Sequence, residues 1–248
     1  MKHINFTLQV HQPYRLRDFN FFEIGGKHQD YFNEELNRDI IQRIAENSYG
    51  PANELLLKAI QKYGDAVKVN FAISGTAIDQ LASYAPTVLD SFKKLSKTGN
   101  VEFLGQTYGH SLPALKSNMI FIYEVKAHSD RVFEVFKKRP TVFSTTGLPF
   151  LKSMEKDLKT LEFAGIVTDG LTMDIGDQNP DYVYKTKSRS PLKLLFRNDS
   201  LSEDIAQRFG DTHWDEWPLT SEKYMHWLKA SDENEQVVNL VLDYAAFG

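Results

Sequence analysis

Short apolar runs alternate with longer amphipathic stretches along the whole chain, and this alternation limits the possible folds most strongly. Seven runs rich in β-branched or aromatic residues predict strands over 4–10, 68–73, 101–104, 141–143, 166–168, 192–196 and 237–242. The stretches between them predict helices over 51–63, 76–84, 87–97, 118–138, 151–163 and 221–228. The last strand is nearly all apolar, as expected for a strand covered on both faces. Strands and helices in this order form parallel βαβ units with right-handed crossovers.

The pattern therefore predicts an α/β fold that occupies residues 1–248 as a single domain. Single-domain α/β barrels commonly have about 250 residues, but periodicity alone leaves a closed barrel and a doubly wound open sheet both possible. The polar segment 174–190 is expected to be an irregular excursion over one face. Because Gly248 follows the last predicted strand by six residues, we expect a barrel truncated after its seventh strand.

Composition excludes several classes of partner. The formal net charge of −4 offers no basic surface for nucleic acid or for an anionic membrane. The chain has no cysteine, which rules out disulfides and thiolate metal sites and fits a reducing compartment. There is no signal-peptide core at the start and no apolar run of the roughly 20 residues that a membrane span needs. We therefore expect a soluble, cytoplasmic protein.

Ligands of α/β barrels and sheets bind where the strands end, at their carboxyl termini. The polar residues predicted at those positions are His11 and Gln12, then Gln106, Tyr108 and His110, then the segment 144–147, Asp169, Arg197, Asp199 and Asp243. Glu102 lies within an apolar strand, where an unpaired carboxylate is costly. It is therefore either a functional acid or the partner of a buried cation.

Other motifs are fewer and less specific. Trp214 lies in a segment with a second tryptophan, and its ring could stack on a sugar or pack in the core. Asp204 and the acid before it could simply open a helix. No glycine-rich nucleotide loop, Gly-x-Ser-x-Gly elbow or His-x-x-x-His pair occurs. A scattered site built from His11, His110 and Asp243 remains possible.

Six segments in a fixed order then point to a family. They are LQVHQPYRLR from Leu8, YAPTVLDSFKKL from Tyr84, VEFLGQTYGHSL from Val101, LSEDIAQRF from Leu201, EWPLT from Glu216 and DYAAFG from Asp243. Together they resemble glycoside hydrolase family 57, in particular its shorter α-amylase-like members, over essentially the whole chain. The resemblance implies a distorted, TIM-like (β/α)7 barrel. It also implies retaining chemistry on an α-glucan or maltooligosaccharide, with no metal and no organic cofactor.

The same resemblance assigns roles to single residues. It implies that His11, with Gln12 beside it, contacts the sugar, and that Glu102, Tyr108 and His110 belong to the second motif. Asp243 matches the general acid/base. The binding groove would also include Trp214. The nucleophilic glutamate of the third motif falls on Gly147, within the segment from Phe143 to Phe150.

Other positions around these motifs also depart from the family pattern. Ser144 and Thr145 replace an arginine and an asparagine, Ala245 and Ala246 replace Glu-Thr, and Gln106 stands where a glutamate is common. The resemblance therefore implies an α-glucan-binding barrel with lost or strongly reduced glycosidase activity. One alternative is an active α-amylase or 4-α-glucanotransferase that uses another carboxylate, Glu102 or Asp204. Further alternatives are a metal-dependent polysaccharide deacetylase, disfavoured by the missing His-x-x-x-His pair, and a barrel that only binds a partner.

Overall fold

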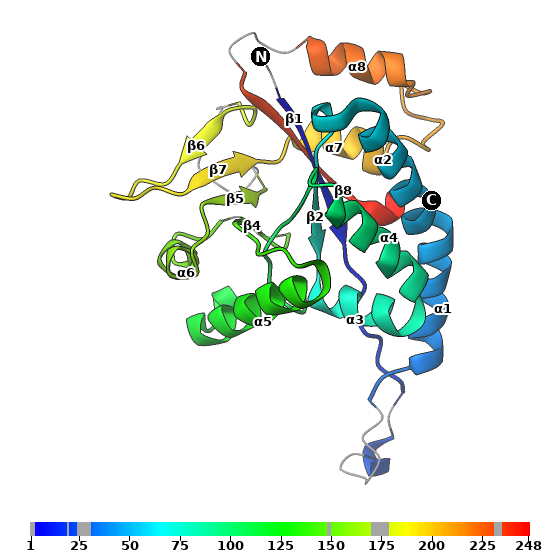
Figure 1. Cartoon of the computed structure of the whole chain (residues 1–248), viewed down its shortest axis with the longest axis vertical. Coiled ribbons are helices and arrows are strands. Elements are labelled where there is room, and N and C mark those ends of the chain that lie inside the picture. The colour runs from blue at the N-terminus through cyan, green and yellow to red at the C-terminus, as the bar shows by residue number, and fades with distance from the viewer. Residues whose placement is uncertain (1–2, 19, 24–30, 148–149, 170–178, 231–234) are drawn as a thin grey trace.

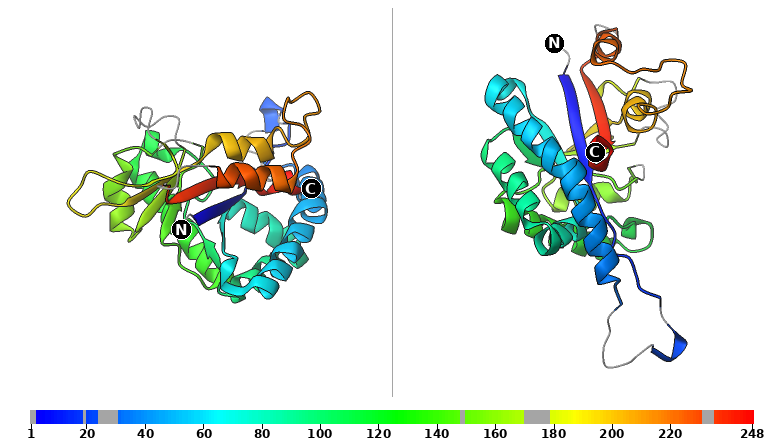
Figure 2. Two further views of the ribbon diagram at one scale, coloured as in Figure 1. Left: turned by 90° about the horizontal axis from the view of Figure 1, so that it is seen from above. Right: turned by 90° about the vertical axis from the view of Figure 1, so that its right-hand side faces the viewer.

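The computed structural model describes residues 3–18, 20–23, 31–147, 150–169, 179–230 and 235–248. The strands are β1 (His3–Val10), β2 (Val69–Ile73), β3 (Val101–Phe103), β4 (Val142–Ser144), β5 (Gly165–Thr168), β6 (Val183–Lys185), β7 (Lys193–Phe196) and β8 (Val237–Asp243). The helices are α1 (Glu34–Ile44), α2 (Gly50–Tyr63), α3 (Gly75–Tyr84), α4 (Pro86–Lys97), α5 (Asn118–Phe136), α6 (Met154–Thr160), α7 (Asp199–Ala206) and α8 (Ser221–Lys229). A π-helical stretch, Ala45–Tyr49, joins α1 to α2 in one long rod (Figure 2, right).

The strands form two four-stranded sheets that contact each other at two places. Their orders are β3-β2-β1-β8 and β4-β5-β7-β6, and every pairing is parallel except that of β6 with β7. Single bridges, Gly105 to Phe143 and Arg197 to Asn239, connect the two sheets. Seven parallel strands therefore follow one another around a distorted ring, with helices on its outside (Figure 1). The predicted α/β fold is confirmed.

All seven predicted strands are present, and the differences lie in elements that the sequence did not predict. β6 falls in the segment that we expected to be irregular; with three residues it is too short to show a period-two pattern. α1 was not predicted, although Asn33 caps it by accepting a hydrogen bond from the Leu36 N–H. Asp204 does not open a helix: α7 starts at Asp199, behind the capping side chain of Asn198.

Along each strand, alternate side chains point into the ring and outward to the helices. Ala72, Leu104, Val167 and Val241 are buried together inside the ring. On the outer side, Phe71 of β2 packs edge-on against Phe92 of α4, with ring centres 5.1 Å apart. The inside of the ring is thus filled by small aliphatic side chains, and the polar residues at its end rest on a packed core.

The outer face of β1 is less covered than the rest. An apolar groove of about 1050 Å³ runs over it between α2 and α8, and its lining includes Phe6, Leu55 and Met225. Within the described part of the chain, no helix lies over this groove. None of the described helices combines the length and the apolar content that crossing a lipid bilayer requires.

Candidate functional site

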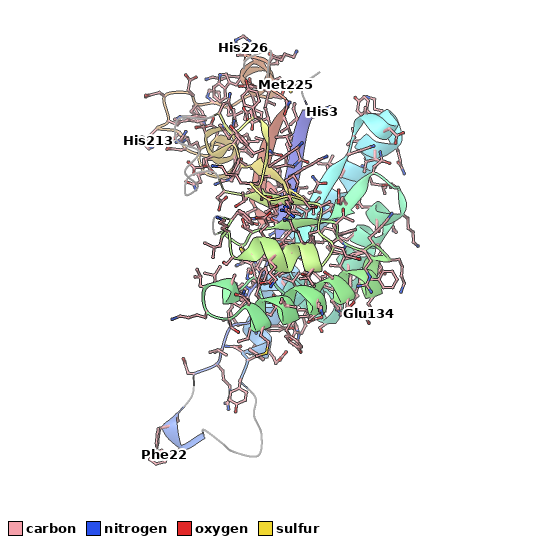
Figure 3. All side chains as sticks on the ribbon, turned by 90° about the vertical axis from the view of Figure 1, so that its left-hand side faces the viewer. His3, Phe22, Glu134, His213, Met225 and His226 are labelled. Atoms are coloured by element: carbon pink, nitrogen blue, oxygen red, sulfur yellow. The ribbon has the colours of Figure 1, made fainter. Side chains whose placement is uncertain are left out.

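The carboxyl ends of the parallel strands bring polar side chains to one end of the ring, which we call the mouth. These residues are His11 after β1, Ser74 after β2, Gln106 after β3, Thr145 after β4, Asp169 after β5, Arg197 after β7 and Asp243 at the end of β8. Strand register aligns them, since Val10 pairs with Ile73 and Gln9 pairs with Asp243. His3, at the start of β1, lies at the opposite end (Figure 3).

Two histidines stack at the mouth although they are 99 positions apart in the chain. The rings of His11 and His110 are 4.4 Å apart and tilted by only 23°. Nδ1 of His11 lies 2.8 Å from the Ser74 hydroxyl, and Nδ1 of His110 lies 3.1 Å from Oε1 of Gln106. Since that oxygen can only accept, His110 donates through Nδ1 and its Nε2 remains an acceptor. The sequence prediction that these two histidines share a site is consistent with this geometry.

Burial keeps both histidines neutral near pH 7. It lowers the pKa of His11 to about 4, with further lowering from His110 and Arg15. Burial also lowers the pKa of His110, while the nearby carboxylate of Asp243 opposes that shift. Two uncharged rings can stack without repulsion. Each can therefore offer a neutral hydrogen-bonding nitrogen to a ligand.

The backbone of His110 is strained in a way that suits a functional position. Its φ angle is +55°, in the left-handed region that non-glycine residues rarely adopt. The segment around it is fixed from below by His128 of α5, which is fully buried. Nε2 of His128 donates to the Ile73 carbonyl at 2.8 Å, and its Nδ1 accepts from the Gln106 N–H at 3.4 Å. One side chain thus ties the end of β2 to the end of β3.

Tyr108 forms part of the mouth wall, but its hydroxyl is already engaged. It donates to Asp79 at 2.6 Å, and Arg131 of α5 holds the same carboxylate at 2.9 Å. The tyrosine ring lies so close to Gly75 that a Cβ there would come within 2.6 Å of it. A ligand can therefore use the face of this ring more readily than its hydroxyl.

Asp243 is the last residue of β8, and its side chain is exposed. Its Oδ1 accepts from the Ala245 N–H at 2.9 Å, which starts the last helical turn. Its field raises the pKa of His110, so the two groups lie close together across the mouth. Gln12 lies behind His11, where its side chain accepts from Arg15 and its carbonyl accepts from Gln80.

Gly147 lies at the mouth in the exposed turn that follows β4. Its φ angle is +63°, and a Cβ built there would meet nothing within 4 Å. Before Gly147 the turn is anchored because Thr146 donates to the Ser111 carbonyl and Thr145 bonds to Thr168. After it, the Phe150 N–H donates to the Thr168 hydroxyl at 2.9 Å. Leu148 and Pro149, in the third-motif segment from Phe143 to Phe150, lie outside the described residues.

Three predicted residues are not brought to the mouth. Glu102 lies toward the amino-terminal end of the ring, where it accepts a hydrogen bond from Thr141, and its carboxylate is exposed instead of buried. Asp204 pairs with Arg208 on the outer helix α7. Trp214 packs edge-on against Trp227 of α8, and its neighbour His213 lies toward the same end as His3 (Figure 3). The strand pattern could not place Glu102 along the barrel axis, and the two outer residues carried no strand signal.

Ser74 is a mouth residue that our sequence prediction overlooked, although it directly follows β2. Its hydroxyl caps α3 by accepting from the Ala77 N–H, and it also bonds to His11. The rule that ligands bind at the carboxyl ends of strands would have identified it. Asp79 and Arg131 had no such signal, because their contact joins residues 52 positions apart.

Removing the Ser74 hydroxyl should cost stability and also free His11. We expect Ser74→Ala to lower the free energy of unfolding by about 1 kcal/mol, the usual value for a lost helix cap. Ser117→Ala, which removes the side-chain cap of α5, provides a matched control. In urea titrations both variants should be destabilised by similar amounts, but only Ser74→Ala should change the NMR titration of the His11 ring. Equal His11 titrations in both variants would contradict the contact.

No three His, Asp, Glu or Cys side chains within the described residues come together as a group that could hold a metal ion. His11, His110 and Asp243 thus do not form the scattered metal site that the sequence left open. The two stacked rings have separate polar partners, Ser74 for His11 and Gln106 for His110.

Comparisons with known proteins agree with this fold. A protein of Methanocaldococcus jannaschii named "Putative alpha-amylase" is 38% identical over 246 residues, which are 99% of this chain and 51% of that protein. The chain thus spans about half the length of this curated relative. The 4-α-glucanotransferase of Thermococcus litoralis superposes with a TM-score of 0.72 at 16% identity, over 100% of this chain and 34% of that one.

A second solved structure shows that the fold is shared more widely. A polysaccharide deacetylase of Mycobacterium smegmatis superposes with a TM-score of 0.63 at 13% identity, over 98% of this chain and 77% of that one. At such low identities these structures bear on the fold alone. The family assignment comes from the sequence: the model of glycosyl hydrolase family 57 matches residues 5–248, and the chain belongs to that family.

Proposed function

We propose that this chain is an α-glucan-binding barrel of family 57 whose glycosidase activity is lost or strongly reduced. The observation that carries the proposal is the turn after β4. There Gly147 has a left-handed backbone and open surroundings. The sequence resemblance assigns the family's nucleophile to this residue. The polar mouth persists around a position that has no carboxylate.

The chemistry of the mouth supports sugar binding. A pyranose hydroxyl both donates and accepts hydrogen bonds, so a sugar site needs acceptor groups as well as donor groups. His11, His110 and Asp243 offer a neutral ring nitrogen, a bare acceptor nitrogen and a carboxylate at one end of the ring. The exposed part of the Tyr108 ring adds an apolar face on which a sugar can stack.

The loss of activity follows from the chemistry of retaining glycosidases. The nucleophile attacks the anomeric carbon while the acid protonates the leaving oxygen, and the first step fails without a carboxylate. Removing an enzymatic nucleophile typically costs about a millionfold in rate, or about 8 kcal/mol of barrier. Asp243 alone can protonate a leaving group but cannot form the glycosyl ester that this mechanism requires.

The active-enzyme alternative needs a substitute carboxylate, and the two candidates are poorly placed. Glu102 lies toward the amino-terminal end and bonds to Thr141, while Asp204 is paired with Arg208 outside the ring. The deacetylase alternative shares the fold, but its metal has no evident group of ligands among the described residues. Neither alternative is favoured by an observation of its own.

Calorimetric titration with maltooligosaccharides tests the binding claim. We expect the unaltered protein to bind maltotetraose at submillimolar to millimolar concentrations and His11→Ala to weaken binding by roughly tenfold, the effect of about 1.4 kcal/mol. His213→Ala is the matched control, since its side chain is 96% exposed and away from the mouth. Heat indistinguishable from dilution at millimolar ligand would exclude glucan binding.

A further inference from the structure

Asp169 and Arg197 enter the mouth side by side from adjacent strands. β5 ends at Thr168 and β7 ends at Phe196, and these two residues are register partners. The Arg197 N–H donates to the Thr168 carbonyl at 2.9 Å, which fixes the two backbones against each other at the point where they leave the sheet. Both side chains thus begin at the same level of the mouth.

The guanidinium of Arg197 is held in place but not fully used. Nη1 bonds to Asp199 at 2.9 Å and Nε donates to the Val241 carbonyl at 3.4 Å. The second terminal nitrogen, Nη2, makes no hydrogen bond to any residue that the structure describes. A rigid, planar donor is therefore left available, with a fifth of the side-chain surface exposed.

Asp169 is the acceptor that matches this donor. Its carboxyl group is half-buried, and it makes neither a hydrogen bond nor an ion pair with the described residues. Burial raises its pKa, while the charge of Arg197 partly opposes the shift. A half-buried carboxylate without a fixed partner is costly to fold, and such groups are typical of binding sites.

A purely structural role as an ion pair would explain the placement of Asp169 beside Arg197 less well. Asp199 already neutralises Arg197 through a direct bond, so Asp169 is not needed for that purpose. Two carboxylates around one guanidinium leave a local charge of −1, which repels phosphate and other anions. The pair is therefore suited to an uncharged ligand that can both donate and accept.

We propose that Asp169 and Arg197 form a sugar subsite that binds two neighbouring hydroxyl groups of one pyranose ring. The Asp169 carboxylate accepts from one hydroxyl, and Nη2 of Arg197 donates to the oxygen of the next. This subsite rests on the proposed glucan binding, and it extends the mouth from the histidine side toward β5 and β7. It is a binding site and takes no part in bond cleavage.

Calorimetric titration of maltotetraose into Asp169→Asn tests the subsite. The asparagine keeps the shape but loses the charged acceptor, so affinity should fall by roughly tenfold. Asp65→Asn removes an exposed charge far from the mouth and should bind like the unaltered protein. Thermal unfolding checks that each variant is folded. A crystal soaked in maltotetraose gives a second measurement on the unaltered protein, and two adjacent hydroxyls should lie within hydrogen-bond distance of Asp169 and Arg197.

The outcomes separate this proposal from the one it rests on. If His11→Ala weakens binding while Asp169→Asn does not, the mouth binds glucan but the subsite is wrong. A soaked crystal with sugar on the histidines and none on Asp169 has the same meaning. If the unaltered protein binds no maltooligosaccharide, both proposals are overturned. Loss of affinity in both variants, with Asp65→Asn unchanged, supports the subsite.

Discussion

Sodium azide should restore cleavage of 4-nitrophenyl α-maltoside by this protein. We expect the release of nitrophenolate to rise by at least roughly tenfold over the rate without azide, a barrier decrease of about 1.4 kcal/mol. The product should be β-maltosyl azide. The proposed loss of the nucleophile adds about 8 kcal/mol of barrier, so an external nucleophile has a large deficit to offset.

The reason lies in the space around Gly147. Nothing approaches within 4 Å of the position where a Cβ would be. On the proposed function this space corresponds to the nucleophilic carboxylate of the family, and a small anion can occupy it. Azide attacks the anomeric carbon as the bond to the nitrophenolate oxygen breaks, and nitrophenolate leaves with the bonding electrons. One displacement inverts the configuration, and no ester to the protein forms. The good leaving group makes protonation by Asp243 unnecessary in this assay.

A restored carboxylate provides the matched variant. Gly147→Glu should raise the rate without azide and remove the response to azide, although a non-glycine residue at φ +63° carries roughly 1–2 kcal/mol of strain. Gly147→Ala carries the same strain without a carboxylate and should stay inactive. Cleavage by the unaltered protein with retained configuration and no response to azide would mean that another carboxylate acts as nucleophile.

The sequence predicted most of the fold because its signals are local. Each of the seven parallel strands shows an apolar run of its own, and helix limits such as Gly64 after α2 depend on nearby residues. The closure of the ring is not local. It depends on single bridges such as Gly105 to Phe143, between residues that no periodicity relates. Periodicity therefore left a barrel and an open sheet equally possible.

The site was predictable to a similar degree. The rule that ligands bind at carboxyl ends correctly located His11, His110 and Asp243, because strand ends can be seen in the sequence. It could not reveal that two histidine rings stack, since this depends on a left-handed backbone at His110. For Glu102 the strand was predicted correctly, but the position of the residue along the ring axis was not. That position depends on how neighbouring strands are staggered.

Acidification should destabilise the protein through His128, the buried side chain beneath the mouth. Its neutral form donates from Nε2 to Ile73 and accepts at Nδ1 from the Gln106 N–H. Protonation would place a second hydrogen on Nδ1, facing that N–H, and would leave a charge in a fully buried position. Burial accordingly lowers the pKa of His128 from 6.5 to about 4.

The sign follows from proton binding in the two states. Below pH 6.5 the unfolded chain protonates this histidine while the folded protein does not, so unfolding takes up a proton and stability falls as the pH falls. The loss starts near pH 6.5 and is complete near pH 4. At 1.36 kcal/mol per pKa unit it amounts to about 3 kcal/mol. Above pH 6.5 the group has no effect.

Urea titrations of the unaltered protein and of His128→Gln between pH 7 and pH 4 measure this contribution. A glutamine amide can donate to Ile73 and accept from the Gln106 N–H, but it does not titrate in this range. The unaltered protein should lose about 3 kcal/mol more than the variant across the interval. Carboxylates elsewhere titrate equally in both proteins and cancel in the difference. If the free energy of unfolding changed with pH in the same way in both proteins, His128 would take up its proton as readily in the folded protein as in the unfolded chain. If the profiles diverge as expected, the contact that joins β2 to β3 weakens in the same acidic range, and the segment that carries His110 loses its support.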